Sequence, residues 1–406
     1  MFTVKTIDET KRIIKNNFND YSLEVIEIDA SIAKGYVISE DIVSTENLPM
    51  FDRSTVDGYA ALDSVVKHAS SSSPVPLKLL GSSEMGKECT FELDETTTVY
   101  VPTGGHIPKG TTTMVMIEDT ESLGSDILIN KSTSRWENIF QKGTDIKALE
   151  TVLVKNTKLN NRHIGVLKSL GIKKVKVYQK LKALIISTGD EITDNEIISL
   201  GQIRDINTYT ISGYLDRYGI DVTKTIVIND DFDLYYDTVK KGFENNDLVI
   251  SSGGSSVGEK DYTARVMEKL KAITLVHGVN IKPGKPTVIS KYNNKLFFGL
   301  PGQPTSAYVV LNEMFDTIYN TIYNLKDVSV KPFIEGILDS KVHSKSGRKL
   351  YQIVSVTYGE EVIVTPLFAK SGMIKALSNA YGYIIINDNV EGIIKGEKVK
   401  VYRFGD

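Results

Sequence analysis

The chain has 406 residues, more than one ordinary domain contains, so several compact units with separate cores are expected. Its composition, 41% hydrophobic, 24% charged and 8% aromatic, is that of a globular protein, and a formal net charge of −3 provides no positive field to attract nucleic acid or an anionic membrane surface. One cysteine, Cys89, excludes an intrachain disulfide and argues against zinc and iron–sulfur chemistry, and a polar N-terminal stretch with no apolar run of about 18 residues predicts a cytoplasmic protein without a membrane span.

The first 180 residues change pattern twice. Apolar residues recur at helical spacing from Val4 to about Phe18 and again around 162–170, whereas the intervening pattern is strand-like. Two of these strand-like segments, 96–102 and 111–118, are joined by a Gly/Pro-rich stretch typical of a hairpin. We therefore predict a β subdomain at 44–144, inserted into a discontinuous helical subdomain formed by 1–43 and 145–180.

The segment from 181 to 327 alternates short β runs with helical patterns, which predicts an α/β three-layer subdomain. Asn207 suits the N-cap of the first helix, Gly219 its C-terminal stop, and Pro304 the first turn of the last helix. Residues 328–406 contain short strands separated by turns, which predict a small β barrel or sandwich. The fold class is α/β multidomain, with strands expected at 183–187, 223–228, 247–251 and 296–300 and helices at 208–219, 233–244, 261–271 and 304–322.

Three loops follow predicted strands, at the edge where open α/β sheets bind ligands. They are STGDEI from Ser187, SSGGSSVGEKDYT after Ile250 and GLPGQPTSA after Phe298. Gly253 and Gly254 allow the backbone to approach a ligand and to turn N–H groups toward phosphate oxygens. Any one of these loops alone is read as an ordinary turn, but the three together favour an anion-binding site.

Carboxylates occur in the same loops: Asp190 and Glu191 in the first, Glu259 and Asp261 in the second. Oxygen ligands beside phosphate-binding loops are what Mg²⁺ requires, because this ion bridges few carboxylates to substrate oxygens. Asp261 also suits the N-cap of the helix that follows it. Both interpretations of Asp261 remain open.

Basic and hydroxyl side chains form a second group. Lys282 and Lys285 flank Pro283–Gly284, and the C-terminal segment adds Arg348 after Gly347 and Ser371 before Gly372. Guanidinium, ammonium and hydroxyl donors suit a tetrahedral oxyanion, although each residue alone is typical of a solvated turn. Near the start of the predicted β subdomain, a structural ion pair could explain Asp52 and Arg53 without any functional role. Asp57, which precedes Gly58, could likewise be a plain turn residue.

Eight motifs in order, spread over essentially the whole chain, resemble the molybdenum insertase family, whose bacterial and archaeal members are called molybdopterin molybdenumtransferase and which includes the C-terminal domain of gephyrin. The motifs are PMFDRSTVDGYA, VPTGG, KGTDI, STGDEI, GQIRDINTY, SSGGSSVGEKDYT, KPGKPT and GLPGQPTSA. The resemblance implies a helical subdomain, an inserted β subdomain, an α/β molybdenum-cofactor-binding subdomain and a C-terminal β barrel. It also implies a homodimer whose active cleft lies between protomers.

The implied reaction is Mg²⁺-dependent cleavage of adenylated molybdopterin, with release of AMP and insertion of molybdate between the dithiolene sulfurs. By resemblance, the acidic residues near metal and nucleotide are Asp190, Glu191 and Asp261, and Asp57, Thr103 and Asp145 are functional positions on the facing subdomains, with Asp57, Asp145, Glu191 and Asp261 as the catalytic set. Positions implicated in binding molybdate or the cofactor are Gly253, Gly254, Ser255, Lys282, Lys285, Pro286, Ser306, Arg348 and Ser371.

The chain departs from the family pattern at two positions, with Ser255 where members usually have Val and Gln303 where they usually have Asn. These departures bear on substrate detail more than on the type of reaction. The alternatives are the related molybdopterin adenylyltransferase, which normally consists of the α/β subdomain alone, and a non-catalytic scaffold module. The intact acidic loops and lysine pair favour catalysis, but the sequence does not separate molybdate from tungstate or name the client enzymes.

Overall fold

The computed structural model describes residues 4–193, 195–254, 262–325, 333–345 and 347–404. The chain divides into two compact units. The main unit comprises Met1–Ser39, Asn156–Asn160 and Lys174–Asp406, and the second unit comprises Glu40–Lys155 and Asn161–Lys173. Each unit is described by itself. The predicted Ser255 and Asp261, with Glu259, lie outside the described residues.

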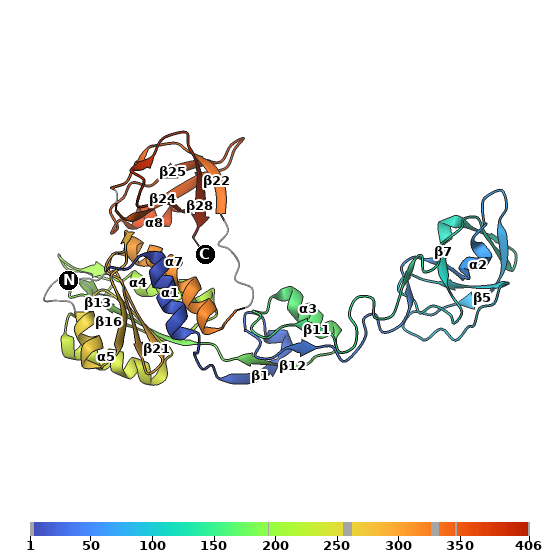
Figure 1. Ribbon diagram of the computed structural model, residues 1–406, viewed down its shortest axis with the longest axis horizontal. Coiled ribbons are helices and arrows are strands. Elements are labelled where there is room, and N and C mark those ends of the chain that lie inside the picture. The colour runs from blue at the N-terminus through green and yellow to red at the C-terminus, as the bar shows by residue number, and fades with distance from the viewer. Residues whose placement is uncertain (1–3, 194, 255–261, 326–332, 346, 405–406) are drawn as a thin grey trace. The chain divides into compact units, whose positions relative to one another are not determined.

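The centre of the main unit is a six-stranded sheet in the order β16-β13-β17-β21-β20-β18 (Figure 1). The four predicted strands are confirmed and pair in parallel; they are β13 (Lys182–Thr188), β16 (Asp221–Ile228), β17 (Leu248–Ser252) and β21 (Lys295–Leu300). Two further strands that the sequence analysis missed extend one edge in antiparallel fashion, β18 (Ile273–His277) and β20 (Val288–Tyr292). β13 and β17 are buried along nearly their whole length, as expected for parallel strands covered on both faces.

Helices cover both faces of this sheet, so the predicted three-layer arrangement is confirmed. On one face lie α1 (Ile7–Phe18), α4 (Asn207–Asp216) and α7 (Pro304–Ile322), and on the other α5 (Phe232–Asn245) and α6 (Tyr262–Lys269). Along β13, Ile185 joins the first core and Ile186 the second, because successive side chains of a strand point to opposite faces. The two cores are therefore separated by one sheet.

Helix termini agree with the sequence in two of three cases. Pro304 occupies the first turn of α7, and Gly219 adopts a positive φ of 71° in the turn that ends α4, three residues after its last residue. The prediction for Asn207 was wrong, because this residue is the first of the helix and caps nothing. Asp205 performs that task, since its Oδ1 accepts hydrogen bonds from the backbone N–H groups of Asn207 (3.1 Å) and Thr208 (3.4 Å).

The N-terminal segment packs into the main unit. A capping box between Thr6 and Glu9 starts α1, and the apolar side of this helix, including Ile14 and Phe18, joins the core that also contains α7. The chain then forms β1 (Val25–Asp29), which pairs antiparallel with β12 (Lys174–Tyr178).

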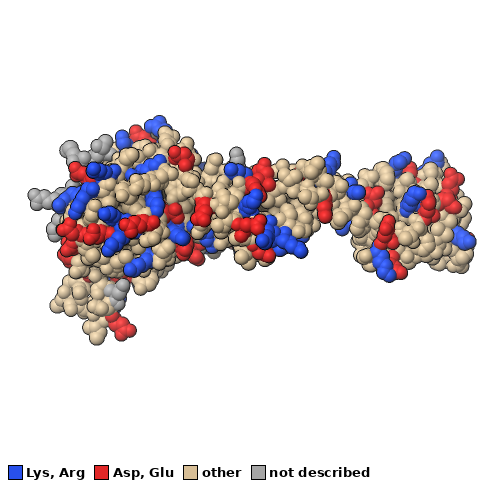
Figure 2. All heavy atoms as spheres, turned by 90° about the horizontal axis from the view of Figure 1, so that it is seen from below, with Lys and Arg blue, Asp and Glu red and all other residues tan. Residues whose placement is uncertain are grey.

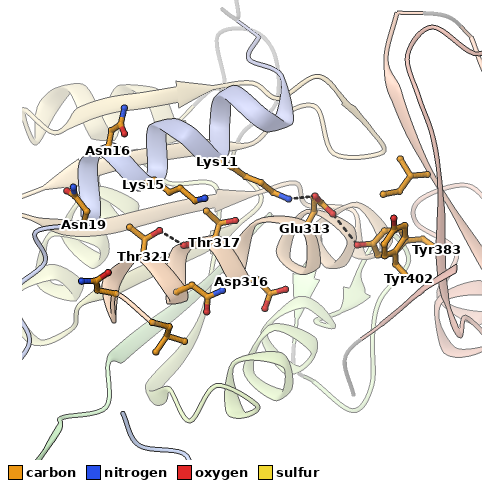
Figure 3. A pocket seen from close by; sticks show the side chains of 14 residues that line it. Lys11, Lys15, Asn16, Asn19, Glu313, Asp316, Thr317, Thr321, Tyr383 and Tyr402 are labelled. Carbon is orange, nitrogen blue, oxygen red and sulfur yellow. Dashed lines mark hydrogen bonds and ion pairs between the residues drawn. The ribbon is translucent and has the colours of Figure 1, made fainter. Parts of the chain in front are cut away.

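A charged contact joins α1, α7 and the C-terminal strands (Figure 3). Glu313, whose side chain is 10% exposed, forms an ion pair with Lys11 and accepts a hydrogen bond of 3.2 Å from the hydroxyl of Tyr383. Burial is the largest cause that raises the pKa of Tyr383, and the Glu313 carboxylate adds to it. This contact lies along a hollow of about 600 Å³ lined by polar side chains of α1 and α7.

The C-terminal strands close into a five-stranded barrel, which confirms the predicted β barrel. Its order is β24-β25-β22-β28-β26, and a further pairing of β24 with β26 closes it. The strands are β22 (Phe333–Leu338), β24 (Lys349–Thr357), β25 (Ile363–Pro366), β26 (Gly382–Ile386) and β28 (Lys398–Arg403). The short β19 (Ile281–Lys282) pairs with β24 and so ties the barrel to the α/β layers, as does α8 (Ile374–Ser378), which contacts α7.

The second unit contains a six-stranded sheet in the order β7-β4-β6-β5-β9-β8. Its strands are β4 (Gly58–Ala61), β5 (Val75–Ser82), β6 (Thr97–Val101), β7 (Thr113–Met116), β8 (Thr120–Leu123) and β9 (Asp126–Ile129), with α2 (Asp63–Val66) beside them and α3 (Asn161–Ser169) further along the chain. The predicted hairpin between 96–102 and 111–118 was wrong, because β4 lies between β6 and β7 and pairs with both. The Gly/Pro-rich stretch therefore connects β6 to β7 across β4 and does not form a tight hairpin turn.

Short two-stranded pairs complete both units: β2 (Ile42–Val43) with β11 (Thr151–Leu153), β3 (Arg53–Ser54) with β10 (Ile139–Phe140), β14 (Ile192–Thr193) with β15 (Ile203–Arg204), and β23 (Val342–His343) with β27 (Gly392–Ile393). Among the described residues, no helix is long and apolar enough to cross a membrane.

Both signs of charge are interspersed over the face drawn in Figure 2.

We predict that Glu313→Gln lowers the free energy of unfolding of the main unit by about 1–3 kcal/mol, because Lys11 loses its charged partner in a largely buried setting. Glu335→Gln is the matched control, since Glu335 pairs with Lys398 at 2.6 Å and both side chains are exposed, so its loss should leave unfolding unchanged. Chemical denaturation followed by circular dichroism measures both. Equal stability of the two variants would contradict the prediction.

Candidate functional site

A cleft of about 1080 Å³ lies in the main unit beyond the carboxyl ends of β13, β17 and β21. It is lined by the three loops that follow these strands, by the turn after β19, and by loops of the barrel near Arg348 and Ser371. Parallel pairing places the ends of the three strands at one edge, which is where ligands bind in open α/β sheets. The structure thus brings most of the predicted binding residues to one place.

Glycine turns form part of the cleft wall. Gly253 has φ +95°, and a Cβ built on it would lie 2.3 Å from the backbone oxygen of Thr188. A Cβ on Gly302 would lie 3.5 Å from the Cα of Gly253. The loops after β13 and β17 therefore approach one another more closely than a side chain at position 253 would allow, whereas a Cβ at position 302 would make an ordinary contact with the loop after β17.

The acidic side of the cleft comes from the loops after β13 and β16. Glu191 and Asp230 line the cleft, and the carboxylate of Glu191 lies over Gly189, where a Cβ would meet its Oε2 at 2.8 Å. Asp190 is not among the lining residues; its Oδ1 accepts a hydrogen bond of 3.0 Å from the backbone N–H of Asp230. The Thr188 hydroxyl donates to Asp230 Oδ1 at 2.9 Å, which connects the two loops again.

The basic side comes from the turn after β19 and from the barrel. Lys282, Lys285 and Pro286 line the cleft with Arg348 and Ser371. Backbone pairing of Ile281 with Lys349 and of Lys282 with Leu350 brings Arg348, one residue earlier, close to the lysine turn. The convergence of these cations is therefore fixed by a strand ladder.

The first turn of α7 completes the cleft. Pro304 and Ser306 line it, Ser306 is only 4% exposed, and no side chain caps this helix. Backbone N–H groups at the start of a helix favour an anion, but Pro304 has no N–H and that of Thr305 donates within the protein, so Ser306 is the first residue of α7 whose N–H could serve. Gln303 precedes the helix, its Oε1 accepts a hydrogen bond from the Ser371 hydroxyl, and the backbone N–H of Thr305 donates to the oxygen of Ser371 at 3.1 Å.

The donor set on the acidic side suits Mg²⁺. Two carboxylates, those of Glu191 and Asp230, line a cleft that also presents backbone groups and cations, and Mg²⁺ takes one or two carboxylates together with substrate oxygens. No group of three His, Cys, Asp or Glu side chains that could hold a metal ion occurs within the described ranges. The carboxylates fit an ion that is shared with a substrate better than an ion held by the protein alone.

The remaining predicted residues, Asp57, Thr103 and Asp145, belong to the second unit and do not line this cleft. Asp57 and Thr103 lie together, because the backbone N–H of Thr103 donates to Asp57 Oδ1 at 2.9 Å, and all three residues are exposed. The neighbouring Asp52 has a structural role, since its Oδ1 accepts from the backbone N–H of Lys142 at 2.6 Å. Arg53 stacks over the Phe140 ring at 5.1 Å.

The sequence analysis missed Asp230, Arg204 and Gln303 as lining residues. For Asp230 the signal was present, because it follows β16, another parallel strand, and the rule that selected the other three loops applies to it equally. Gln303 lies in one of the three selected loops but was singled out only as a departure from the family pattern, and Arg204 follows no predicted strand. Their places depend on how the loops fold.

Three family models match the chain: the MoeA N-terminal region (domain I and II) over residues 5–171, the probable molybdopterin binding domain over 184–320, and the MoeA C-terminal region (domain IV) over 335–404. A protein of Methanocaldococcus jannaschii named for molybdopterin biosynthesis is 33% identical over 95% of this chain and 94% of its own length. The molybdopterin molybdenumtransferase of Staphylococcus epidermidis is 29% identical over 96% and 93%. The crystal structure of a molybdopterin biosynthesis MoeA protein from Pyrococcus horikoshii is similar over the whole of both chains, with 30% identity and a TM-score of 0.81.

We predict that Gly253→Ala destabilises the main unit more than Gly201→Ala does. Both glycines adopt positive φ, +95° and +93°, which costs a side chain about 1–3 kcal/mol, but only the Cβ at position 253 would also clash with the Thr188 oxygen; position 201 has nothing within 4 Å. Thermal unfolding of the two variants isolates the contribution of the close approach. Equal melting temperatures would show that the loops do not touch in this way.

Proposed function

Because the chain belongs to the MoeA family of molybdopterin biosynthesis proteins, we propose that it is a molybdopterin molybdenumtransferase that inserts molybdate into adenylated molybdopterin and releases AMP. The observation that carries the proposal is the cleft, in which an acidic side, glycine turns and a basic side face one hollow. We propose further that the chain is built of the four subdomains predicted from the sequence, and that it acts in the cytoplasm.

Molybdate suits the basic side. A tetrahedral dianion accepts hydrogen bonds from several directions, and Lys282, Lys285 and Arg348 supply charged donors around it. Ser306 and Ser371 add hydroxyl groups, and Pro286 shapes the turn. Holding the oxyanion beside the dithiolene sulfurs accelerates their reaction chiefly through positioning.

The phosphoanhydride of the adenylated pterin suits the opposite side. The Gly253–Gly254 turn and the first turn of α7 would hold the phosphates, with Gly254 rather than Gly253 as the donor because the Gly253 N–H donates to Leu300; Ser255, the next residue in the sequence, lies outside the described residues. Mg²⁺ bound by Glu191 and Asp230, with Asp190 behind them and Asp261 on the following loop, would neutralise charge on the phosphates during cleavage. Among the described residues, no Cys or paired Ser–His lines the cleft, so we assign no covalent intermediate.

Two alternatives are less well supported. A molybdopterin adenylyltransferase needs the α/β subdomain alone, whereas this chain matches family models of the N- and C-terminal regions as well. A non-catalytic scaffold would not need an acidic and a basic side in one cleft. Binding of tungstate in place of molybdate is compatible with the same donors.

The test is to incubate the purified protein with adenylated molybdopterin, Mg²⁺ and either molybdate or tungstate, and to measure AMP and metal-loaded cofactor. We expect AMP and loaded cofactor to appear together and only when both Mg²⁺ and an oxyanion are present. Adenylation of molybdopterin from ATP without molybdate would instead identify an adenylyltransferase.

We propose that the active form is a homodimer in which Asp57, Thr103 and Asp145 of one protomer serve the cleft of the other. At molybdate concentrations well below half-saturation, we predict that Asp57→Ala and Lys285→Ala each keep about a tenth of wild-type activity or less, whereas their equimolar mixture, after exchange of subunits, recovers about a quarter, because half of the dimers then contain one intact cleft. Sedimentation at the assay concentration measures whether the active protein is a dimer. An active monomer, or a mixture that recovers nothing after verified exchange, would overturn the homodimer proposal.

For the oxyanion we predict that Lys285→Ala or Arg348→Ala raises the molybdate concentration for half-maximal insertion about tenfold or more, since a lost charged contact costs roughly 1.5–3 kcal/mol. Binding of the adenylated pterin should change less. Lys345→Ala, an exposed basic residue three positions before Arg348 that does not line the cleft, is the control. If Arg348→Ala loses pterin binding and keeps its molybdate dependence, the proposed division of the cleft is wrong.

A further inference from the structure

Asn207 is a buried amide at the point where three loops of the cleft meet. It is the first residue of α4 and only 4% exposed. Its side chain is not among those lining the cleft, although its neighbour Ile206 is. A buried residue in this place is not accessible to a ligand in the cleft, but it can determine how the lining loops are arranged.

The two N–H groups of the Asn207 amide are used to join two strand ends. Nδ2 donates to the hydroxyl of Ser252 at 2.5 Å and to the backbone oxygen of Gly302 at 2.7 Å. Ser252 is the last residue of β17, directly before the Gly253–Gly254 turn, and Gly302 follows β21 and precedes Gln303. The Ser252 hydroxyl donates in turn to the oxygen of Pro301 at 3.4 Å, which closes the network.

The orientation of the amide is set by these donors. Asn207 Oδ1 is buried and has no hydrogen-bond partner within the part of the chain that the structure describes. A buried carbonyl without a partner is unfavourable, and such groups in native proteins call for an explanation. The explanation here is that reversing the amide would place Oδ1 against the Gly302 oxygen and lose that contact, while the contact with Ser252 would persist only if its hydroxyl became the donor.

The contact fixes the distance between two glycine turns. Gly253 donates its backbone N–H to the oxygen of Leu300 at 3.3 Å, and a Cβ on Gly302 would lie 3.5 Å from the Gly253 Cα. The turn after β17 carries backbone groups that the proposed function assigns to a phosphate, and the turn after β21 leads into the first turn of α7. A shift of either turn changes the separation of the two anion-binding elements.

We propose that Asn207 is a positioning residue of the cleft, whose amide holds the turn after β17 and the turn after β21 at the spacing that the substrate requires. The identity of that substrate rests on the proposed function, whereas the spacing does not. Asn207 touches no reacting atom in this proposal and acts through Ser252 and Gly302.

Asn246 provides a matched control in the same sheet. It is 5% exposed, its Nδ2 donates to the oxygen of Gly242 at 2.8 Å, and its Oδ1 accepts from the Thr223 hydroxyl at 2.5 Å. It precedes β17, which begins at Leu248, whereas Asn207 contacts the end of that strand. Asn246→Ala therefore removes comparable hydrogen bonds at the edge opposite the cleft.

The experiment compares Asn207→Ala, Asn246→Ala and the wild type by hydrogen exchange and by steady-state kinetics with adenylated molybdopterin, Mg²⁺ and molybdate. We expect faster exchange of the Gly253 amide in Asn207→Ala only. Because displacement by about 1 Å can cost a hundredfold in rate, we expect kcat to fall about tenfold to a hundredfold, with KM for the pterin changed less than about threefold. Asn246→Ala should be destabilised to a similar extent with kcat unchanged.

Unchanged exchange at Gly253, or an equal fall of kcat in both variants, would overturn the proposal and leave Asn207 a structural residue only. Should Asn207→Ala fail to fold, Ser252→Ala removes one of the two contacts and retains the bond to Gly302; it should show the same changes to a smaller degree, and an unaltered kcat and exchange would again overturn the proposal. An inactive wild type whose Gly253 amide is nevertheless protected by Asn207 would refute the proposed function and not the positioning role.

Discussion

The burial of helix α7 is the constraint on which the main unit depends. Most of its nineteen residues are buried, so the helix can move only if the sheet, α1 and the barrel move with it. Its first turn forms part of the cleft, Glu313 at its middle joins Lys11 and Tyr383, and the ring of Tyr319 near its end packs at a tilt against those of Tyr323 and Tyr218. Burial raises the pKa of Tyr218 and Tyr319, which marks this region as poorly solvated. The place of the first turn of α7 in the cleft is thus set by packing along the whole helix.

The parts of the fold that depend on local interactions could be predicted from the sequence, and those that depend on distant pairings could not. The parallel strands and their helices were predicted because buried apolar runs and helical spacing are properties of short segments. β18 and β20 were missed because Ile273–His277 alternates weakly and is partly exposed at an edge. The false hairpin has a different cause: β4, which pairs with both β6 and β7, lies about 40 residues earlier in the sequence than β6. Pairing between distant segments leaves no trace in a local pattern.

The residues of the candidate site likewise divide into those with a local sequence signal and those placed by contacts between distant segments. Glycine turns and carboxylates after strands could be identified by their place in the sequence, and Asp230 could have been. Asn207 could not, because its partners Ser252 and Gly302 are 45 and 95 residues away and the local signal favoured a cap. A residue that joins loops resembles any other polar residue at a helix start until the loops are placed.

A chain with a net charge of −3 must build an anion site from local geometry. In the cleft this is achieved by backbone pairing: Lys282 lies on β19, which pairs with β24, and Arg348 directly precedes β24. Side chains on a paired ladder lose less conformational freedom on binding than side chains on independent loops, so their charges are more nearly arranged before the oxyanion arrives. On the acidic side, the loops after β13 and β16 are instead joined by the hydrogen bonds of Asp190 and Thr188 with Asp230. The carboxylates of this side belong to loops that these hydrogen bonds hold together. In the proposed reaction the basic side suits a small anion of fixed shape, and the acidic side, with the glycine turns beside it, suits a phosphate chain with its metal.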